Sequence, residues 1–273
     1  MSFTIVTVLH QSGPHLEKLL ASIDRHLPGG EERPQVVVVD TGSTDDGPKA
    51  AREWGAELVE LPHNPGYGAA NNAGVERATH DVTVLLNPDV ELLDGSIGDL
   101  VADARACNAL LVPRLLNPDG SIQDSAHPQP GTRSEILRAF VPRTAEPWRS
   151  DEPRQVGWAI TAALAAKTEI LRRLGPFDPD DFLFYEDLDL CLRSDVPTCL
   201  VPDVQLVHEG GHSTGPQRLQ DEARRRREVV GKRLGPRAQR RDDLAQLITF
   251  ARAAAFRRRS REQLKALRVA RRA

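Results

Sequence analysis

The sequence contains little cysteine, few aromatic residues and no long apolar run. Its three cysteines, Cys107, Cys191 and Cys199, form no CxxC pair, which argues against structural zinc and disulfides. No stretch approaches the roughly 18 uninterrupted apolar residues of a membrane-spanning helix, and the first residues lack the basic start of a signal peptide. We therefore expect a cytoplasmic protein.

Three common catalytic signatures are also missing. There is no GxGxxG dinucleotide fingerprint, no GxxxxGK[ST] phosphate-binding loop and no GxSxG nucleophile turn. Dinucleotide binding, ATP hydrolysis and serine-hydrolase chemistry therefore lose their usual support from sequence.

What is present is an acidic body followed by a basic tail. Residues 216–273 hold 19 of the 36 Lys and Arg residues but only 6 of the 39 Asp and Glu residues, so the tail has a net charge of +13 and the body one of −16. Apolar residues at helical spacing run through the tail. We predict a domain over residues 1–215 and a basic helical extension over residues 216–273.

Strand and helix patterns alternate along the body. Near-continuous β-branched runs over 3–9, 35–40 and 81–87, with a further strand over 56–61, are separated by helical patterns. This order predicts an α/β fold with a mostly parallel central sheet flanked by helices. Beyond it we expect two strands around a turn within 110–125, a mobile loop over 126–153, and a strand leading into a helix over 158–175.

Polar residues follow three of the predicted parallel strands, at His10 with Ser12, at Asp40 and at Asn87, and ligands bind at this edge in open α/β sheets. Asp40 could accept hydrogen bonds from a base or ribose, and Asp89, in the segment Asn87-Pro88-Asp89, could hold a divalent cation. The alternative is that each aspartate caps the next helix or turn. The loop that starts at Asn64 has glycines that would let the backbone approach a ligand, although a plain turn explains it as well.

Two further clusters contain candidate catalytic groups. Glu186, Asp187 and Asp189 lie within an apolar run, where a buried carboxylate needs a partner or serves as a general base. The alternative is an acidic first helical turn paired with Arg193. His208 and His212 share a Gly-rich loop, and they are either surface residues or neighbours of a metal held by carboxylates.

Five blocks in this order resemble the family 2 inverting glycosyltransferases of the nucleotide-diphospho-sugar (GT-A) fold, over about residues 3–215. Within that family the chain is most similar to the rhamnosyltransferase branch that builds bacterial cell-wall polysaccharides and related glycans. The blocks are VVVVDTGSTD (36–45), LPHNPGYGAANNAG (61–74), LLNPDVEL (85–92), GPFDPDDFLFYEDLDLCLR (175–193) and VPDVQLVHEGGHST (201–214).

The resemblance implies roles for individual residues. Asp187, in the Glu186-Asp187 pair, matches the catalytic base, and Asp89 matches the last acid of the DxD motif, which binds Mg²⁺ or Mn²⁺ on the diphosphate. His208 matches the histidine that completes this site, whereas Asn87 replaces the first acid. The donor-binding positions that match are Thr7, Val8, Leu9, Asp40, Gly42, Ser43, Asn64, Gly66, Asn71, Asn87, Pro88 and Asp89.

The family implies transfer of a sugar, with rhamnose suggested by the branch, from a dTDP-, UDP- or GDP-linked donor to a hydroxyl of a glycan, lipid-linked or small-molecule acceptor. The chain departs from the family at a shortened turn over residues 194–197 and at Trp158, which is either an acceptor-stacking wall or core packing. The basic tail suggests peripheral contact with the inner face of the cell membrane, or else a solvated helix or a homodimer contact.

Two other functions compete with this interpretation. A nucleotidyltransferase would share the fold, but no Gly-rich basic triphosphate loop follows the first strand. A degenerate, non-enzymatic binding protein is disfavoured because Asp40, Asp89, Asp187 and His208 are all present. Nucleic-acid binding is not expected, since the basic charge is confined to the tail.

Overall fold

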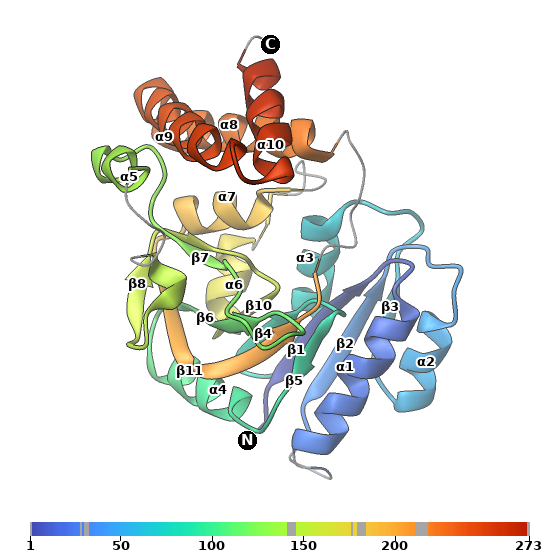
Figure 1. Ribbon diagram of the computed structural model, residues 1–273. Coiled ribbons are helices and arrows are strands. Elements are labelled where there is room, and N and C mark those ends of the chain that lie inside the picture. The colour runs from blue at the N-terminus through green and yellow to red at the C-terminus, as the bar shows by residue number, and fades with distance from the viewer. Residues whose placement is uncertain are drawn as a thin grey trace.

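The protein is an α/β/α body with a cap of three C-terminal helices (Figure 1). The computed structural model describes residues 2–27, 29, 33–140, 146–175, 177–178, 184–210 and 218–271. The body begins with the alternating elements β1 (Thr4–Leu9), α1 (Gly13–His26), β2 (Gln35–Asp40), α2 (Gly47–Trp54), β3 (Glu57–Glu60), α3 (Tyr67–Arg77) and β4 (Val82–Leu86).

The second half of the body is less regular. It contains β5 (Val90–Leu92), α4 (Ile97–Ala106), β6 (Leu110–Leu116), β7 (Ala126–His127), α5 (Arg133–Arg138), a 3-10 turn (Pro147–Arg149), β8 (Arg154–Val156), β9 (Trp158–Ala159), β10 (Ala163–Lys167), α6 (Thr168–Leu174), α7 (Glu186–Arg193) and β11 (Thr198–His208).

The central sheet has the order β3-β2-β1-β4-β10-β6-β11-β5, with β8 paired to β11. The first four strands are parallel, as the sequence predicts, whereas β10 runs antiparallel to both of its neighbours. Parallel order resumes between β6 and β11, and β5 and β8 pair antiparallel with β11. The ends of β1, β2 and β4 that carry Leu9, Asp40 and Leu86 therefore share one edge.

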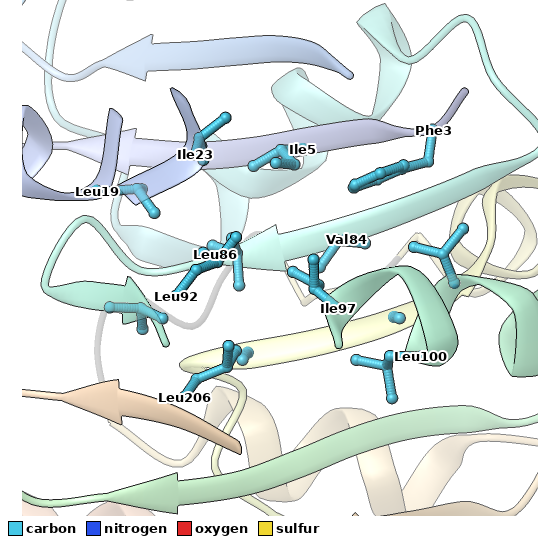
Figure 2. Packing of buried hydrophobic residues seen from close by; sticks show 14 of the residues in the cluster. Phe3, Ile5, Leu19, Ile23, Val84, Leu86, Leu92, Ile97, Leu100 and Leu206 are labelled. Carbon is cyan, nitrogen blue, oxygen red and sulfur yellow. The ribbon is translucent and has the colours of Figure 1, made fainter. Parts of the chain in front are cut away.

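Side chains that alternate along the strands form two apolar layers, one on each face of the sheet. On one face, Ile5 and Leu86 pack with Leu19 of α1 and Leu100 of α4, as Figure 2 shows for this layer. On the other face, neighbouring strand residues such as Val6 and Leu85 pack against α3, α6 and α7. Burial on both sides explains why these strands are continuously apolar in sequence.

Two predictions for the middle of the chain are wrong. The expected second strand before residue 125 is reduced to an isolated bridge between Leu116 and Ile122. The segment 126–153, expected to be a mobile loop, contains β7, α5 and the 3-10 turn. Thr132 caps α5 by accepting a hydrogen bond from the Glu135 amide, so the helix has a local signal that the scattered prolines obscure.

The basic tail is helical, as expected, and forms α8 (Arg218–Leu234), α9 (Pro236–Ala254) and α10 (Arg258–Ala270). These helices lie next to α7, at the end of the molecule away from the N-terminus (Figure 1). Val229 and Val230 of α8 pack in one cluster with Leu188 of α7 and Trp158. The body and the extension therefore share a hydrophobic cluster, and their independence as domains remains a prediction.

Gly74 allows α3 to approach the sheet. A Cβ atom at this position would lie 2.3 Å from Val6 Cγ1 and 3.0 Å from Val39 Cγ2. We expect Gly74→Ala to lower the free energy of unfolding by about 1–3 kcal/mol in urea denaturation, because the rigid layer cannot absorb the extra atom. Gly98→Ala in α4 is the control, because nothing lies within 4 Å of its added Cβ. Equal losses in the two variants would contradict the packing argument.

Candidate active site

A cavity of about 680 Å³ lies at the shared strand edge, and we name it the strand-end cavity. It is formed by the segments that follow β1, β2 and β4, the start of α3, the segment before β10 and the start of α7. Its lining residues are Val8, His10, Gln11, Ser12, His15, Thr41, Asn64, Gly66, Tyr67, Asn87, Pro88, Asp89, Ile160, Thr161, Ala162, Glu186 and Asp187.

Asp40 shapes the turn after β2. Its carboxylate accepts hydrogen bonds from the amides of Gly42 (3.3 Å) and Ser43 (3.0 Å), and Gly42 has a φ of +88°. The side chain is buried and does not line the cavity, although the next residue, Thr41, does. Thr41 Oγ1 lies 3.0 Å from His10 Nδ1, which joins the ends of β1 and β2. Asp40 thus forms the turn that the alternative interpretation expects.

The loop before α3 is held by its own asparagines. Asn64 Oδ1 accepts a hydrogen bond from the Gly66 amide (2.9 Å), and Gly66, with a φ of +97°, begins the helix. Asn71 is buried and donates to the Tyr67 carbonyl (3.0 Å). Asn64 and Gly66 line the cavity, whereas Asn71 does not line it and stabilises the start of α3 through its hydrogen bond to Tyr67.

Tyr67 links three segments of the site. Its hydroxyl donates to Asn87 Oδ1 (2.7 Å) and lies 3.2 Å from the Thr161 carbonyl oxygen. Burial, together with the nearby negative charge of Glu186, raises the pKa of Tyr67 well above its usual value, so the hydroxyl keeps its proton. Because Asn87 Oδ1 accepts from Tyr67, the Asn87 amide nitrogen is the group that can donate to a ligand.

Asp89 and His208 meet at the end of the β4–β5 turn. Asp89 Oδ1 lies 3.4 Å from His208 Nε2, and Asp89 Oδ2 accepts from the Gly210 amide (3.1 Å). The other ring nitrogen of His208, Nδ1, lies 2.7 Å from Gln123 Oε1. Asp89 lines the cavity, and the largely buried His208 lies beside it.

Glu186 and Asp187 enter the cavity from the start of α7. The two residues before them, Phe184 and Tyr185, have φ values of +71° and +59°, a left-handed conformation that is strained for residues other than glycine. Gln11, in the cavity wall, has a φ of +50°. Among the described residues these are the three non-glycine positions with positive φ, and such strain clusters at functional sites.

The carboxylate of Asp187 has the properties of a base. Burial raises its pKa to about 6, although the amides of Leu188 and Thr161 act to lower it. The Leu188 amide donates to Asp187 Oδ1 over 2.7 Å and fixes the side chain. A carboxylate with a pKa near 6 is ionised at neutral pH yet basic enough to take a proton in a transition state.

Asp189, the third acid of the apolar run, has a structural partner set. It is fully buried and accepts hydrogen bonds from Arg193 Nε (3.1 Å), Arg233 Nε (2.6 Å) and Arg233 Nη2 (2.9 Å). The pairing with Arg193 is the alternative that the sequence left open. The pairing with Arg233 joins α7 to α8 of the C-terminal extension.

Trp158 lies outside the strand-end cavity. Its ring stacks on His127 with centroids 4.2 Å apart, and only 6% of the residue is exposed. Arg226 of α8 lies 5.7 Å from the ring centroid. Trp158 lines a second cavity, together with Tyr185.

The predicted site residues therefore divide into three groups. Residues that line the strand-end cavity are Val8, Asn64, Gly66, Asn87, Pro88, Asp89, Glu186 and Asp187. Thr7, Leu9, Asp40, Gly42, Ser43, Asn71 and His208 lie behind it in strands, turns and the α3 helix, and Trp158 lines the other cavity. Gln11, Tyr67 and Thr161 also line the strand-end cavity and are not among the predicted site residues.

Comparison with known proteins identifies the family. Residues 4–166 match the profile described as glycosyl transferase family 2. The chain belongs to this family. It is also 34% identical to the N-acetylglucosaminyl-diphospho-decaprenol L-rhamnosyltransferase of Mycobacterium tuberculosis, over 77% of this chain and 77% of the relative. The predicted family, its rhamnosyltransferase-like branch and the assignment as a glycosyltransferase are thereby confirmed.

Solved structures agree with the predicted GT-A fold. The mannosyltransferase PcManGT from Pyrobaculum calidifontis, in complex with GDP-Man and Mn2+, is similar with a TM-score of 0.64 and 17% identity, covering 98% of this chain and 85% of that one. GalNAc-T7 with UDP, GalNAc and Mn2+ is similar with a TM-score of 0.63 and 16% identity, covering 99% of this chain and 55% of that one. Within the described part of this glycosyltransferase, no helix is both long and apolar enough to cross a bilayer.

Proposed function

We propose that this glycosyltransferase moves rhamnose from a nucleoside-diphosphate donor to a hydroxyl of a lipid-diphosphate-linked N-acetylglucosamine acceptor, with inversion at the anomeric carbon. The sugar and the acceptor are those in the name of the mycobacterial relative. The observation that carries the proposal is that Asp89 and Asp187, from segments about a hundred residues apart, line one cavity. A diphosphate-binding group and a base are thereby brought to the same small volume.

Asp187 is the base in this mechanism. Its carboxylate takes the proton from the acceptor hydroxyl as the oxygen attacks the anomeric carbon, and a single displacement opposite the diphosphate inverts the configuration. The Leu188 amide holds the carboxylate in place. Glu186 lines the same cavity, and the Tyr67 hydroxyl, whose pKa is raised by burial and by the nearby charge of Glu186, donates to Asn87 and keeps it oriented.

The diphosphate side consists of Asp89, His208 and Asn87. When His208 Nδ1–H donates to Gln123, its Nε2 lone pair faces Asp89 Oδ1, a pair of donors that suits a divalent cation. Asp89 and His208 are the residues that would hold Mg²⁺ or Mn²⁺, with the Asp89 carboxylate supplying the oxygen that such cations prefer. Among the described residues no group of three His, Cys, Asp or Glu side chains could hold a metal ion. Such an ion would offset the charge developing on the leaving diphosphate. The side-chain amide of Asn87 donates a hydrogen bond to the leaving diphosphate.

The test is nucleoside-diphosphate release by the purified protein. dTDP-, UDP- and GDP-linked sugars are supplied with Mg²⁺ or Mn²⁺ and a lipid-diphosphate-linked N-acetylglucosamine acceptor. We expect turnover with a rhamnose nucleotide, rhamnose on the acceptor, and strong inhibition by a chelator. Release of pyrophosphate instead would favour a nucleotidyltransferase. No release with any donor would contradict the proposal.

The pH profile provides a second test. Because Asp187 must be ionised to act as a base and has a pKa of about 6, we expect kcat/KM to fall about tenfold per pH unit below that value and to level off above it. Donor binding measured across the same range separates the loss of the base from the loss of the substrate. A flat profile from about pH 5 to pH 8 would contradict the assignment.

The extension also supports peripheral membrane contact as a proposal. It exposes Leu244, Phe256 and Val269 in a segment rich in arginine, and each basic residue near an anionic surface contributes about 1 kcal/mol. Flotation with anionic and neutral vesicles tests it, with retention on anionic vesicles expected at low salt. If the same surface instead forms a homodimer contact, the molecular mass measured in solution would be that of two chains. We place the enzyme in the cytoplasm, on the inner face of the cell membrane.

A further inference from the structure

The second cavity, of about 710 Å³, lies next to the strand-end cavity, and we name it the arginine cavity. It is formed by the segment around β7, by α5 and by α8 and α9, with Trp158 and Tyr185 in its wall. Tyr185 lines the arginine cavity, whereas the next residue, Glu186, lines the strand-end cavity. The two cavities are thus separated by the strained turn that presents Asp187.

The charge of this cavity favours an anion. Among the described lining residues, the charged side chains are Arg138, Arg226, Arg252 and Arg257 against Glu135 and Glu146. Arg226 is already held by Asp242 (2.7 Å) and lies 3.5 Å from Glu135. The positive charge left for a ligand therefore comes from the other three arginines.

Of these three arginines, Arg138 and Arg257 make no side-chain hydrogen bond within the described residues. Arg138 Nη1 is also buried, and a buried donor without a partner is costly unless a ligand pairs with it. Arg257 lies exposed between α9 and α10. Arg252 donates to the Ala139 carbonyl (2.6 Å), which ties α9 to the end of α5.

Apolar groups occupy another part of the same cavity. Phe250 is half-buried in α9, and Phe256, which follows α9, is 90% exposed. Ala253 lies between them in the lining. An exposed phenylalanine next to unpaired arginines suits a ligand that has a charged group joined to a hydrocarbon chain. The free donor has a sugar and a nucleoside on its diphosphate and offers no such chain.

We propose that the arginine cavity binds the diphosphate and the first isoprenoid unit of the lipid-linked acceptor, an inference that rests on the proposed function. Arg138 and Arg257 pair with the diphosphate oxygens, and Phe250 and Phe256 contact the hydrocarbon. The acceptor sugar then extends past Tyr185 toward Asp187. The C-terminal extension is in this way part of the acceptor site, whereas the strand-end cavity binds the donor.

Binding of farnesyl diphosphate to the full chain, measured by calorimetry, tests this inference. We expect Arg138→Gln and Arg257→Gln each to weaken binding about tenfold or more, because each removes a charge-assisted hydrogen bond. Arg259→Gln is the matched control, since Arg259 is exposed two residues further on and does not line the cavity. Phe256→Ser is expected to weaken farnesyl diphosphate binding and to leave inorganic pyrophosphate binding unchanged.

The strand-end cavity is tested separately, with nucleoside diphosphates that carry no sugar. We expect the arginine variants to bind them as the unmodified protein does, and farnesyl diphosphate not to displace them. Equal farnesyl diphosphate affinity in both arginine variants and the control would overturn the inference, as would displacement by a nucleoside diphosphate or by vesicles of anionic phospholipid. Failure to bind any nucleoside diphosphate would count against the proposed function. The comparison of farnesyl diphosphate binding among the arginine variants would still test the inference about the arginine cavity.

Discussion

Replacing Asp187 with asparagine is expected to lower turnover by about 10²- to 10⁴-fold while binding of the nucleoside diphosphate stays nearly unchanged. Asparagine has the same shape and its Oδ1 can still accept the 2.7 Å hydrogen bond from the Leu188 amide, so the start of α7 keeps its geometry. It cannot take a proton from the acceptor hydroxyl. Steady-state rates of nucleoside-diphosphate release, with thermal stabilisation by the nucleotide as the binding measurement, give the two quantities.

Asp195→Asn is the matched control for this variant. Asp195 follows the end of α7, is exposed, and pairs with the exposed Arg173, so its neutralisation should leave turnover unchanged. Glu186→Gln determines which carboxylate of the pair is the base, since Glu186 lines the same cavity. Full activity in Asp187→Asn, or loss of nucleotide binding in step with turnover, would remove Asp187 from the role of base.

Much of the strand-end cavity could be predicted from sequence because its parts follow parallel strands. Asn87 and Asp89 follow a buried strand, and the carboxyl ends of β1, β2 and β4 meet at one edge. The same rule does not give the orientation of the Asp40 carboxylate, which accepts from the amides of its own turn, and its contact with a base or ribose stays a prediction. The alternation of strands and helices in the sequence predicts which residues lie at the strand edge. It does not predict how their side chains are oriented, because local hydrogen bonds determine the orientation.

Contacts across long sequence separations could not be predicted. Tyr67 bonds to Asn87 and lies close to the carbonyl of Thr161, and nothing near Thr161 in the sequence marks it as part of a site. The partner of Trp158, His127, likewise comes from a segment with no regular pattern. The contact at Thr161 depends on the antiparallel insertion of β10 into the sheet, and the pair of Trp158 and His127 depends on the separate β7–β9 sheet. A parallel α/β pattern predicts neither.

The net charge of the tail also concealed its internal pairing. Arg226 and Arg227 of α8 bind the buried Asp242 and Asp243 of α9. These two arginines are therefore paired inside the extension and do not contribute to the basic surface expected from composition. Composition counts charges but not their neighbours. Arg138 of the body and Arg257 of the tail, by contrast, line the arginine cavity, and neither makes an ion pair within the described residues.

Asp189→Ala is expected to lower the free energy of unfolding by about 3 kcal/mol, in the range found when one partner of a buried ion pair is removed. The carboxylate is fully buried and binds Arg193 and Arg233, so the variant removes the buried counter-ion that the two guanidinium groups share, although Arg233 keeps Asp178 at 3.7 Å. It also loses the ion pair that fastens α8 to α7, two residues beyond Asp187. Urea denaturation of the full chain measures the change.

The matched control for Asp189→Ala is Glu262→Ala in α10, which removes a surface ion pair with Arg258 and should cost less than about 0.5 kcal/mol. The double variant of Asp189→Ala with Arg233→Ala should lose little more than the single aspartate variant, because the two side chains act as one unit. Additive losses, or a loss in Asp189→Ala as small as that of the control, would show that the ion pair does not hold the extension. Since α7 presents Asp187, we also expect Asp189→Ala to lower turnover at temperatures where the chain is still folded, an effect that the control should lack.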